Sequence, residues 1–133
     1  MTGETDLSIL LRSMSPQLNP GHYVFCTLPD GCLPPGLEPI GSFREQEGLT
    51  VIVEKAQAQD AGLGIDYVAA WITLNVHSAL QAVGLTAAFA TALGRAGISC
   101  NVIAGYYHDH LFVGEDEAGR AMDVLTQLAA NGA

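Results

Sequence analysis

Basic residues are scarce in this chain, and charged residues of either sign are few, at 14% of 133 residues. Five lysines and arginines stand against 14 aspartates and glutamates, which gives a formal net charge of -9. Because nucleic acid or an anionic membrane would need a clustered basic patch, the composition excludes both as partners. With 49% hydrophobic residues and little charge, the chain is also expected to bury apolar surface between copies, as a homodimer or higher homo-oligomer.

Long apolar runs and paired cysteines are lacking too. No apolar run approaches the ~18 residues of a membrane span, and the N-terminal residues show neither the basic start nor the apolar block of a signal peptide. The three cysteines are odd in number and lie in or near apolar runs, which fits buried thiols in a reducing compartment better than a disulfide framework. We therefore expect a cytoplasmic protein.

Signatures of catalysis are equally scarce: no serine lies in a Gly-x-Ser-x-Gly motif, and no glycine-rich segment carries a phosphate-binding lysine. The one dense cluster of reactive groups is His108-Asp109-His110. In an extended strand its two imidazoles would share a face and could bind a transition metal if a third ligand joined them. A polar hairpin turn in which Asp109 accepts backbone hydrogen bonds is the favoured interpretation. We expect no catalytic residue, metal or cofactor, with a metal-dependent enzyme at this cluster as an alternative.

Residues 83–113 predict a turn, an amphipathic helix, a strand and a hairpin in direct succession. Apolar residues recur at the three-and-four spacing of one helix face. They are Leu85, Ala88, Phe89, Ala92, Leu93 and Ala96. Gly97 suits the left-handed end of this helix, and Gly84 allows a sharp turn before it. The first helical amides have no carbonyl partner within the helix, so they favour a carboxylate or phosphate.

The remaining pattern predicts two halves joined near residues 61–67. Strands are expected at residues 22–28, 39–44, 49–54, 67–76, 98–104 and 111–113. Helices are expected at residues 7–14, where Pro16 stops the first, at 55–61, at 85–96 and after Gly114, with a turn at 77–83. The second half is then βαββα without a last strand. That strand must come from the first half or from a second copy.

Several segments resemble the ACT domains, small regulatory modules that bind amino acids. The matching segments are residues 83–89 (VGLTAAF), 96–102 (AGISCNV) and 105–113 (GYYHDHLFV), with weaker matches at 14–21 and 23–26. Residues 96–102 are similar to the aspartate-kinase version of the domain, and the whole is similar to the family's small stand-alone proteins. The resemblance implies an α+β fold of the ferredoxin-like βαββαβ type. We expect two ACT-like lobes, residues 1–66 and 67–133, that share or exchange strands.

The resemblance also implies a ligand site between the strand-to-helix turn of one lobe and the second strand of another. Carried onto this sequence, Gly84, Leu85 and Thr86 would offer backbone amides, while Asn101 and Val102 would contribute from the strand. Asn101 lies in an otherwise apolar strand, where a buried amide costs free energy unless it is hydrogen-bonded. Its partner is either a neighbouring loop or the ligand.

These expectations describe a non-catalytic regulatory module that binds a small molecule, an amino acid. The alternative from another class is an oligomerisation or scaffold protein that has lost its ligand. The sequence identifies neither the amino acid nor the regulated partner.

Overall fold

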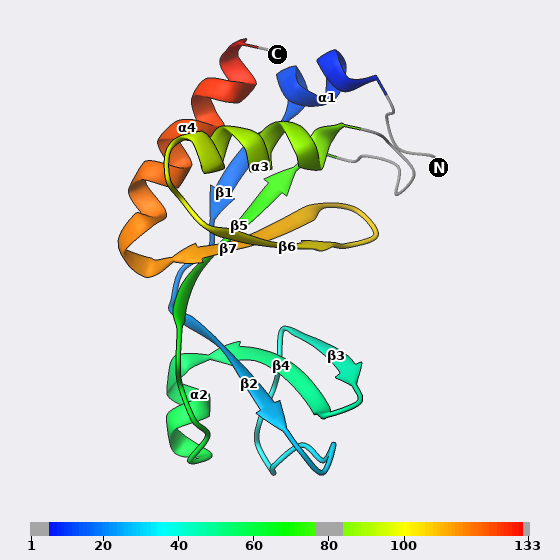
Figure 1. Ribbon diagram of the computed structural model, residues 1–133, viewed down its shortest axis with the longest axis vertical. Coiled ribbons are helices and arrows are strands. Elements are labelled where there is room, and N and C mark those ends of the chain that lie inside the picture. The colour runs from blue at the N-terminus through cyan, green and yellow to red at the C-terminus, as the bar shows by residue number, and fades with distance from the viewer. Residues whose placement is uncertain (1–5, 77–83, 132–133) are drawn as a thin grey trace. The chain divides into compact units, whose positions relative to one another are not determined.

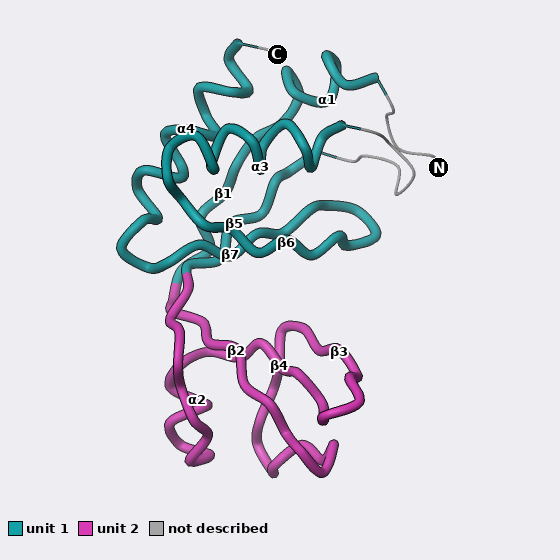
Figure 2. The backbone as a smooth tube through the Cα atoms, viewed as in Figure 1, with its two compact units in different colours: residues 1–20, 70–133 teal, residues 21–69 magenta. Residues whose placement is uncertain are grey.

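A computed structural model describes residues 6–76 and 84–131, which form two compact units (Figure 2). Unit 1 comprises residues 1–20 and 70–133, and unit 2 comprises residues 21–69. Strand β5 (Val68–Asn75) runs from unit 2 into unit 1. The turn expected at residues 77–83 lies outside the described residues.

Unit 2 is an antiparallel sheet with one helix. Its elements are β2 (Tyr23–Leu28), β3 (Gly41–Glu45), β4 (Gly48–Glu54), α2 (Lys55–Asp60) and the start of β5. The strand order is β3-β4-β2-β5. Alternate residues of β2 and β4 form the core, because successive side chains of a strand point to opposite faces. This core contains Val24, Cys26, Leu28, Leu37, Val51, Val53 and Ala58.

Unit 1 combines N-terminal and C-terminal segments (Figure 1). Its helices are α1 (Leu7–Ser13), α3 (Leu85–Arg95) and α4 (Ala118–Asn131), the last preceded by a 3₁₀ turn at Glu115–Glu117. Its strands are β1 (Ser15–Leu18), the larger part of β5, β6 (Cys100–Ala104) and β7 (Asp109–Gly114). Their order is β1-β5-β7-β6.

Each unit has the strand order of a ferredoxin-like fold. Counted along a βαββαβ unit, unit 1 uses β5, β6, β7 and β1 as strands one to four, and unit 2 uses β2, β3, β4 and β5. Both sheets then have the order 4-1-3-2, so β5 is the first strand of one unit and the last strand of the other. The strand that the second half lacks is β1, paired antiparallel from Ser15 opposite Asn75 to Leu18 opposite Ile72. The expectation of an α+β fold with shared strands is confirmed.

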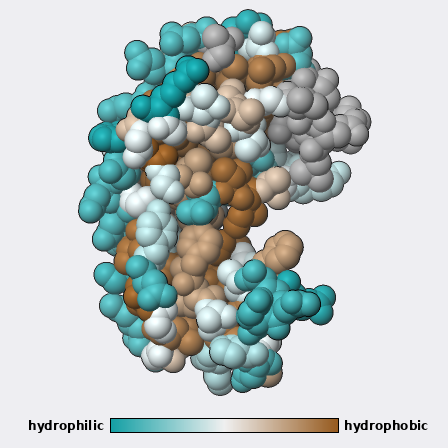
Figure 3. Space-filling model, in the orientation of Figure 1, coloured by the Kyte–Doolittle hydropathy of each residue, from teal (hydrophilic) through white to brown (hydrophobic). Residues whose placement is uncertain are grey.

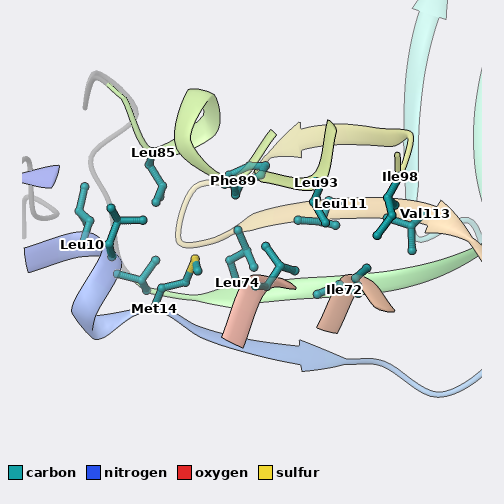
Figure 4. Packing of buried hydrophobic residues seen from close by; sticks show 14 of the residues in the cluster. Leu10, Met14, Ile72, Leu74, Leu85, Phe89, Leu93, Ile98, Leu111 and Val113 are labelled. Carbon is teal, nitrogen blue, oxygen red and sulfur yellow. The ribbon is translucent and has the colours of Figure 1, made fainter. Parts of the chain in front are cut away.

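The core of unit 1 lies between its helices and one face of its sheet, called here the helix face. In Figure 4 the side chains of Leu85, Phe89 and Leu93 on α3 point toward those of β5 and β7. Fully burying one such side chain stabilises a fold by about 1.5–3 kcal/mol. These three are the buried members of the six-residue stripe expected from the sequence. Gly97, at φ 76°, follows the helix in the left-handed conformation.

Candidate ligand site

The turn before α3 leaves the first amides of the helix without an acceptor inside it. Gly84 is left-handed, with φ 101°, and its carbonyl accepts the first helical hydrogen bond, from the Ala88 amide at 2.8 Å. The amides of residues 85–87 therefore have no acceptor within the helix. Leu85 is buried and Thr86 is exposed, so the side chains of the turn serve different roles: one anchors the helix and the other faces outward.

Gly84 is required by the conformation of this turn. A φ near 101° is a region that residues with a Cβ seldom adopt. A Cβ at this position would also lie 3.1 Å from Cδ2 of Leu7 on α1. The structure thus explains the glycine by backbone conformation and by its close approach to α1.

Asn101 and Val102 lie on β6, at the edge of the unit 1 sheet. Val102 is opposite Leu111, on the helix face, and packs against the core. Asn101 is opposite Phe112, on the other face, and is exposed. The expectation of a buried amide at Asn101 is wrong, because an edge strand leaves that side chain open to water. Within unit 1 the predicted site residues are divided between two faces of the sheet.

The hairpin favoured from the sequence is present, but Asp109 lies in its second strand and not in its turn. His108 lies in the turn at residues 105–108, while Asp109 and His110 begin β7. The Gly105 amide donates to the His108 carbonyl at 2.9 Å, and Nδ1 of His108 is 3.4 Å from the Val76 carbonyl oxygen. Because extended backbone does not include both histidines, the geometry assumed for a two-histidine metal pair is not present.

Asp109 is a buried acid, with 8% of its surface exposed. It alternates with His110 along β7, so its side chain is on the helix face with Leu111. Burial raises the pKa of its carboxyl, and the neighbouring His110 and His108 partly oppose that shift. The hairpin therefore holds a carboxyl whose charged form is disfavoured.

A hydrogen-bonded cluster lies on the second face of the unit 1 sheet, opposite the helix face. Nδ2 of Asn19 donates to Oγ1 of Thr73 at 2.9 Å and to the Trp71 carbonyl at 3.2 Å. Nε1 of Trp71 donates to Nδ1 of His110 at 3.1 Å, and Oγ1 of Thr73 lies 3.1 Å from the same nitrogen. The Trp71 ring also stacks on Phe112, with centroids 6.4 Å apart. The cluster connects the segment after β1 to β5 and β7.

This cluster determines the tautomer of His110. An indole N–H can only donate, so Nδ1 of His110 must accept and the proton of the neutral ring sits on Nε2. Burial lowers the pKa of His110, His108 lowers it further and Asp109 opposes the shift. In this state neither ring nitrogen offers a free lone pair to a metal. Among residues 6–76 and 84–131, no three histidine, cysteine or acidic side chains are grouped to hold one.

The ACT domain family matches the sequence twice, over residues 2–70 and residues 67–127. The protein belongs to the ACT domain family. Its two matches overlap at the start of β5, the strand that both units use. No helix in the described part of the chain has the length and apolar character needed to cross a membrane.

Solved structures extend this result. A Vibrio cholerae protein of unknown function, described as a possible transport protein, is 55% identical, with a TM-score of 0.84, over 92% of this chain and 95% of that one. An Agrobacterium tumefaciens protein is 18% identical, with a TM-score of 0.68, over 87% and 89%. The ligand-free regulatory subunit of Thermus thermophilus aspartate kinase is 14% identical, with a TM-score of 0.59, over 85% and 95%. The last two show the fold alone. No curated protein matches the sequence.

Proposed function

We propose that this ACT protein is a non-catalytic regulatory module that binds an amino acid between two copies of the chain. The backbone amides of Gly84, Leu85 and Thr86 in one copy would receive the ligand carboxylate. Asn101 and Val102 of the second copy would contact the ligand from β6. The observation that carries this proposal is the left-handed Gly84 at the start of α3, which leaves helical amides without an acceptor in the helix.

The edge strand β6 supports pairing between copies. Residues 100–104 contain neither charge nor proline, the features by which proteins usually protect a sheet edge. Ile103 is 41% exposed and Asn101 is exposed. Elsewhere the surface also carries large apolar side chains, and Figure 3 shows apolar patches among polar ones. A two-fold dimer in which β6 pairs with its counterpart would cover this edge.

Three further expectations belong to the same proposal. Residues 1–66 and 67–133 would be the two ACT-like lobes, which correspond to the two repeats in the sequence. We expect no metal or cofactor, and the tautomer of His110 disfavours the metal-dependent alternative. Cys26, Cys32 and Cys100 are free thiols, which suits a reducing compartment such as the cytoplasm.

Thermal denaturation in the presence of each of the twenty amino acids tests the proposal. A ligand that binds only the folded chain stabilises it by ~2.7 kcal/mol at one hundred times its dissociation constant. For an amino acid that raises the melting temperature, Asn101→Ala should weaken binding by about 1–3 kcal/mol. Because Asn101 is exposed, the variant should keep its ligand-free stability.

Asn131→Ala, at the exposed end of α4, is the matched control and should bind normally. If no amino acid shifts the melting temperature while light scattering shows a dimer, the scaffold alternative is correct. A monomer at micromolar concentration would contradict the shared site.

A further inference from the structure

Unit 2 contains a pocket of about 340 Å³ beside β2. It is lined by Phe25, Cys26, Thr27, Thr50, Gly64 and Asp66. Strand β5 pairs with β2 only at Tyr23 and Val24. The pocket therefore lies beside the part of β2 that follows this pairing, where Gly64 and Asp66 of the segment leading into β5 also line it. All six lining residues belong to unit 2, and none is among the ligand residues proposed above.

Most polar side chains of this pocket offer hydrogen-bond acceptors, and the Thr27 hydroxyl can accept as well as donate. The Thr50 hydroxyl donates to Oε1 of Glu45, so its oxygen lone pairs remain for a ligand. Sγ of Cys26 lies 3.5 Å from the Gly64 carbonyl and directs its proton there. Burial and, secondarily, the Asp66 carboxylate raise the pKa of this thiol, which keeps it neutral. Asp66 is the only charged residue of the lining, and Glu45 adds a second negative charge beside Thr50.

The apolar wall of the pocket is Phe25. It lies on the same face of the sheet as Thr27, and Thr27 is opposite Thr50 on β4. An aromatic ring beside carboxylate and hydroxyl oxygens suits a ligand with a cationic head and a short hydrocarbon stem. An ammonium group has three donors and no acceptor, which matches these acceptors. An anion would meet the Asp66 carboxylate in the lining and the Glu45 carboxylate beside Thr50, and no cationic side chain lines the pocket.

We propose that this pocket binds small primary alkylammonium compounds, with the ammonium group at Asp66 and Thr50 and the stem against Phe25. The volume falls at the lower end of ligand pockets, about 300–1,000 Å³, and is large enough for a small ligand of this kind. The negative charge of the whole chain, -9, raises the local concentration of such cations. This site is independent of the amino-acid site in unit 1.

Nuclear magnetic resonance of the ¹⁵N-labelled full chain tests the proposal, with n-butylammonium chloride as the probe. We expect saturable shifts confined to residues 25–27, 50 and 64–66, and none with the matched anion n-butyrate. Asp66→Asn should raise the dissociation constant about ten- to a hundredfold, as expected for loss of a hydrogen bond to a charged group. Thr50→Val should raise it less.

Asp60→Asn is the matched control, because it removes the same charge from an exposed position of unit 2 outside the pocket. It should bind n-butylammonium within about twofold of the original protein at constant ionic strength. Equal weakening by Asp60→Asn and Asp66→Asn would overturn the proposal, because it would indicate general attraction of cations. Unsaturable shifts, or displacement of the probe by Ca²⁺ at low concentration, would overturn it as well.

Discussion

Acid should destabilise unit 1 through His110, whose neutral form the structure requires. Nδ1 of His110 accepts from Nε1 of Trp71 at 3.1 Å, so a proton on Nδ1 would place two donors against each other. Burial, the main cause, lowers the pKa of His110 below its usual value of 6.5 in the folded state. At pH values between this lowered pKa and ~6.5, the unfolded chain binds more protons than the folded chain. The contribution of His110 to the free energy of unfolding is therefore fully present above pH ~6.5 and is lost as pH falls through the folded-state pKa. The loss is at most about 1.4 kcal/mol per pH unit.

Two substitutions separate the hydrogen bond from the titration. Trp71→Phe removes the indole N–H and keeps a ring, so it should cost about 0.5–1.5 kcal/mol at neutral pH. It should also raise the pKa of His110, because the opposing donor is gone. His110→Gln cannot titrate, and its stability should depend less on pH between about 7.5 and 5.5, a range around the ordinary histidine pKa.

Urea unfolding followed by circular dichroism gives these free energies, and Trp71, the only tryptophan, reports the cluster by fluorescence. His22→Gln, an exposed histidine of unit 2, is the control and should retain the pH dependence of the original chain. Two other titratable groups, His108 and Asp109, act on His110 and are present in every variant, so the difference isolates His110. Equal pH slopes for His110→Gln and the original chain would refute the reasoning.

Three other outcomes follow from the fold. Asp109→Asn should raise the melting temperature at neutral pH and not at acidic pH. The pKa of the Asp109 carboxyl is raised in the folded state, so the carboxyl stabilises the fold fully below its unfolded-state pKa and loses that contribution as pH rises through its folded-state pKa. Gly84→Ala should lower the free energy of unfolding by about 1–2 kcal/mol. Gly94→Ala, inside α3 and facing open space, should raise it by about 1 kcal/mol. Chemical denaturation of both variants measures these two changes. Removal of residues 1–20 should unfold unit 1, because α1 and β1 leave with them. If circular dichroism keeps most of the helical signal, which α3 and α4 of unit 1 supply, this expectation is wrong.

Short sequence patterns predicted the helices and strands that form because of their own residues. The spacing of Leu85, Phe89 and Leu93 predicts α3, and all three are buried. Strand β4 follows from its β-branched run at residues 51–53. The predicted strand at residues 111–113 was too short, because the two polar residues that begin β7 resemble a turn.

Strand β1 was not predicted, and the reason is physical. Its sequence, SPQL, has no alternation of apolar residues, and its residues are mostly exposed. Pro16 was expected only to stop the first helix, yet it lies within β1, opposite Leu74. Proline is tolerated there because an edge strand does not need every backbone N–H for pairing. The strand exists because β5, far along the chain, has a free edge.

The candidate site shows the same division between local and distant causes. Gly84 could be predicted because a turn before a helix favours a left-handed glycine. The exposure of Asn101 could not, since apolar neighbours in sequence do not reveal that β6 lies at an edge. The cluster of Asn19, Trp71 and His110 depends on how β5 and β7 pair and on where the chain goes after β1. The sequence signal for this cluster is Thr73, a polar residue within an otherwise apolar strand.

Strand sharing has a consequence for how the two ACT repeats fold. Residues 1–66 alone would lack β5, whose first residues pair with Tyr23 and Val24 of β2. Residues 67–133 alone would lack β1, which pairs with β5 over four residues. A boundary near residue 67 can therefore mark a repeat in the sequence without marking two segments that fold independently. Since β5 is needed by both sheets, loss of its structure in one unit removes a strand from the other, and we expect the whole chain to unfold as one cooperative unit.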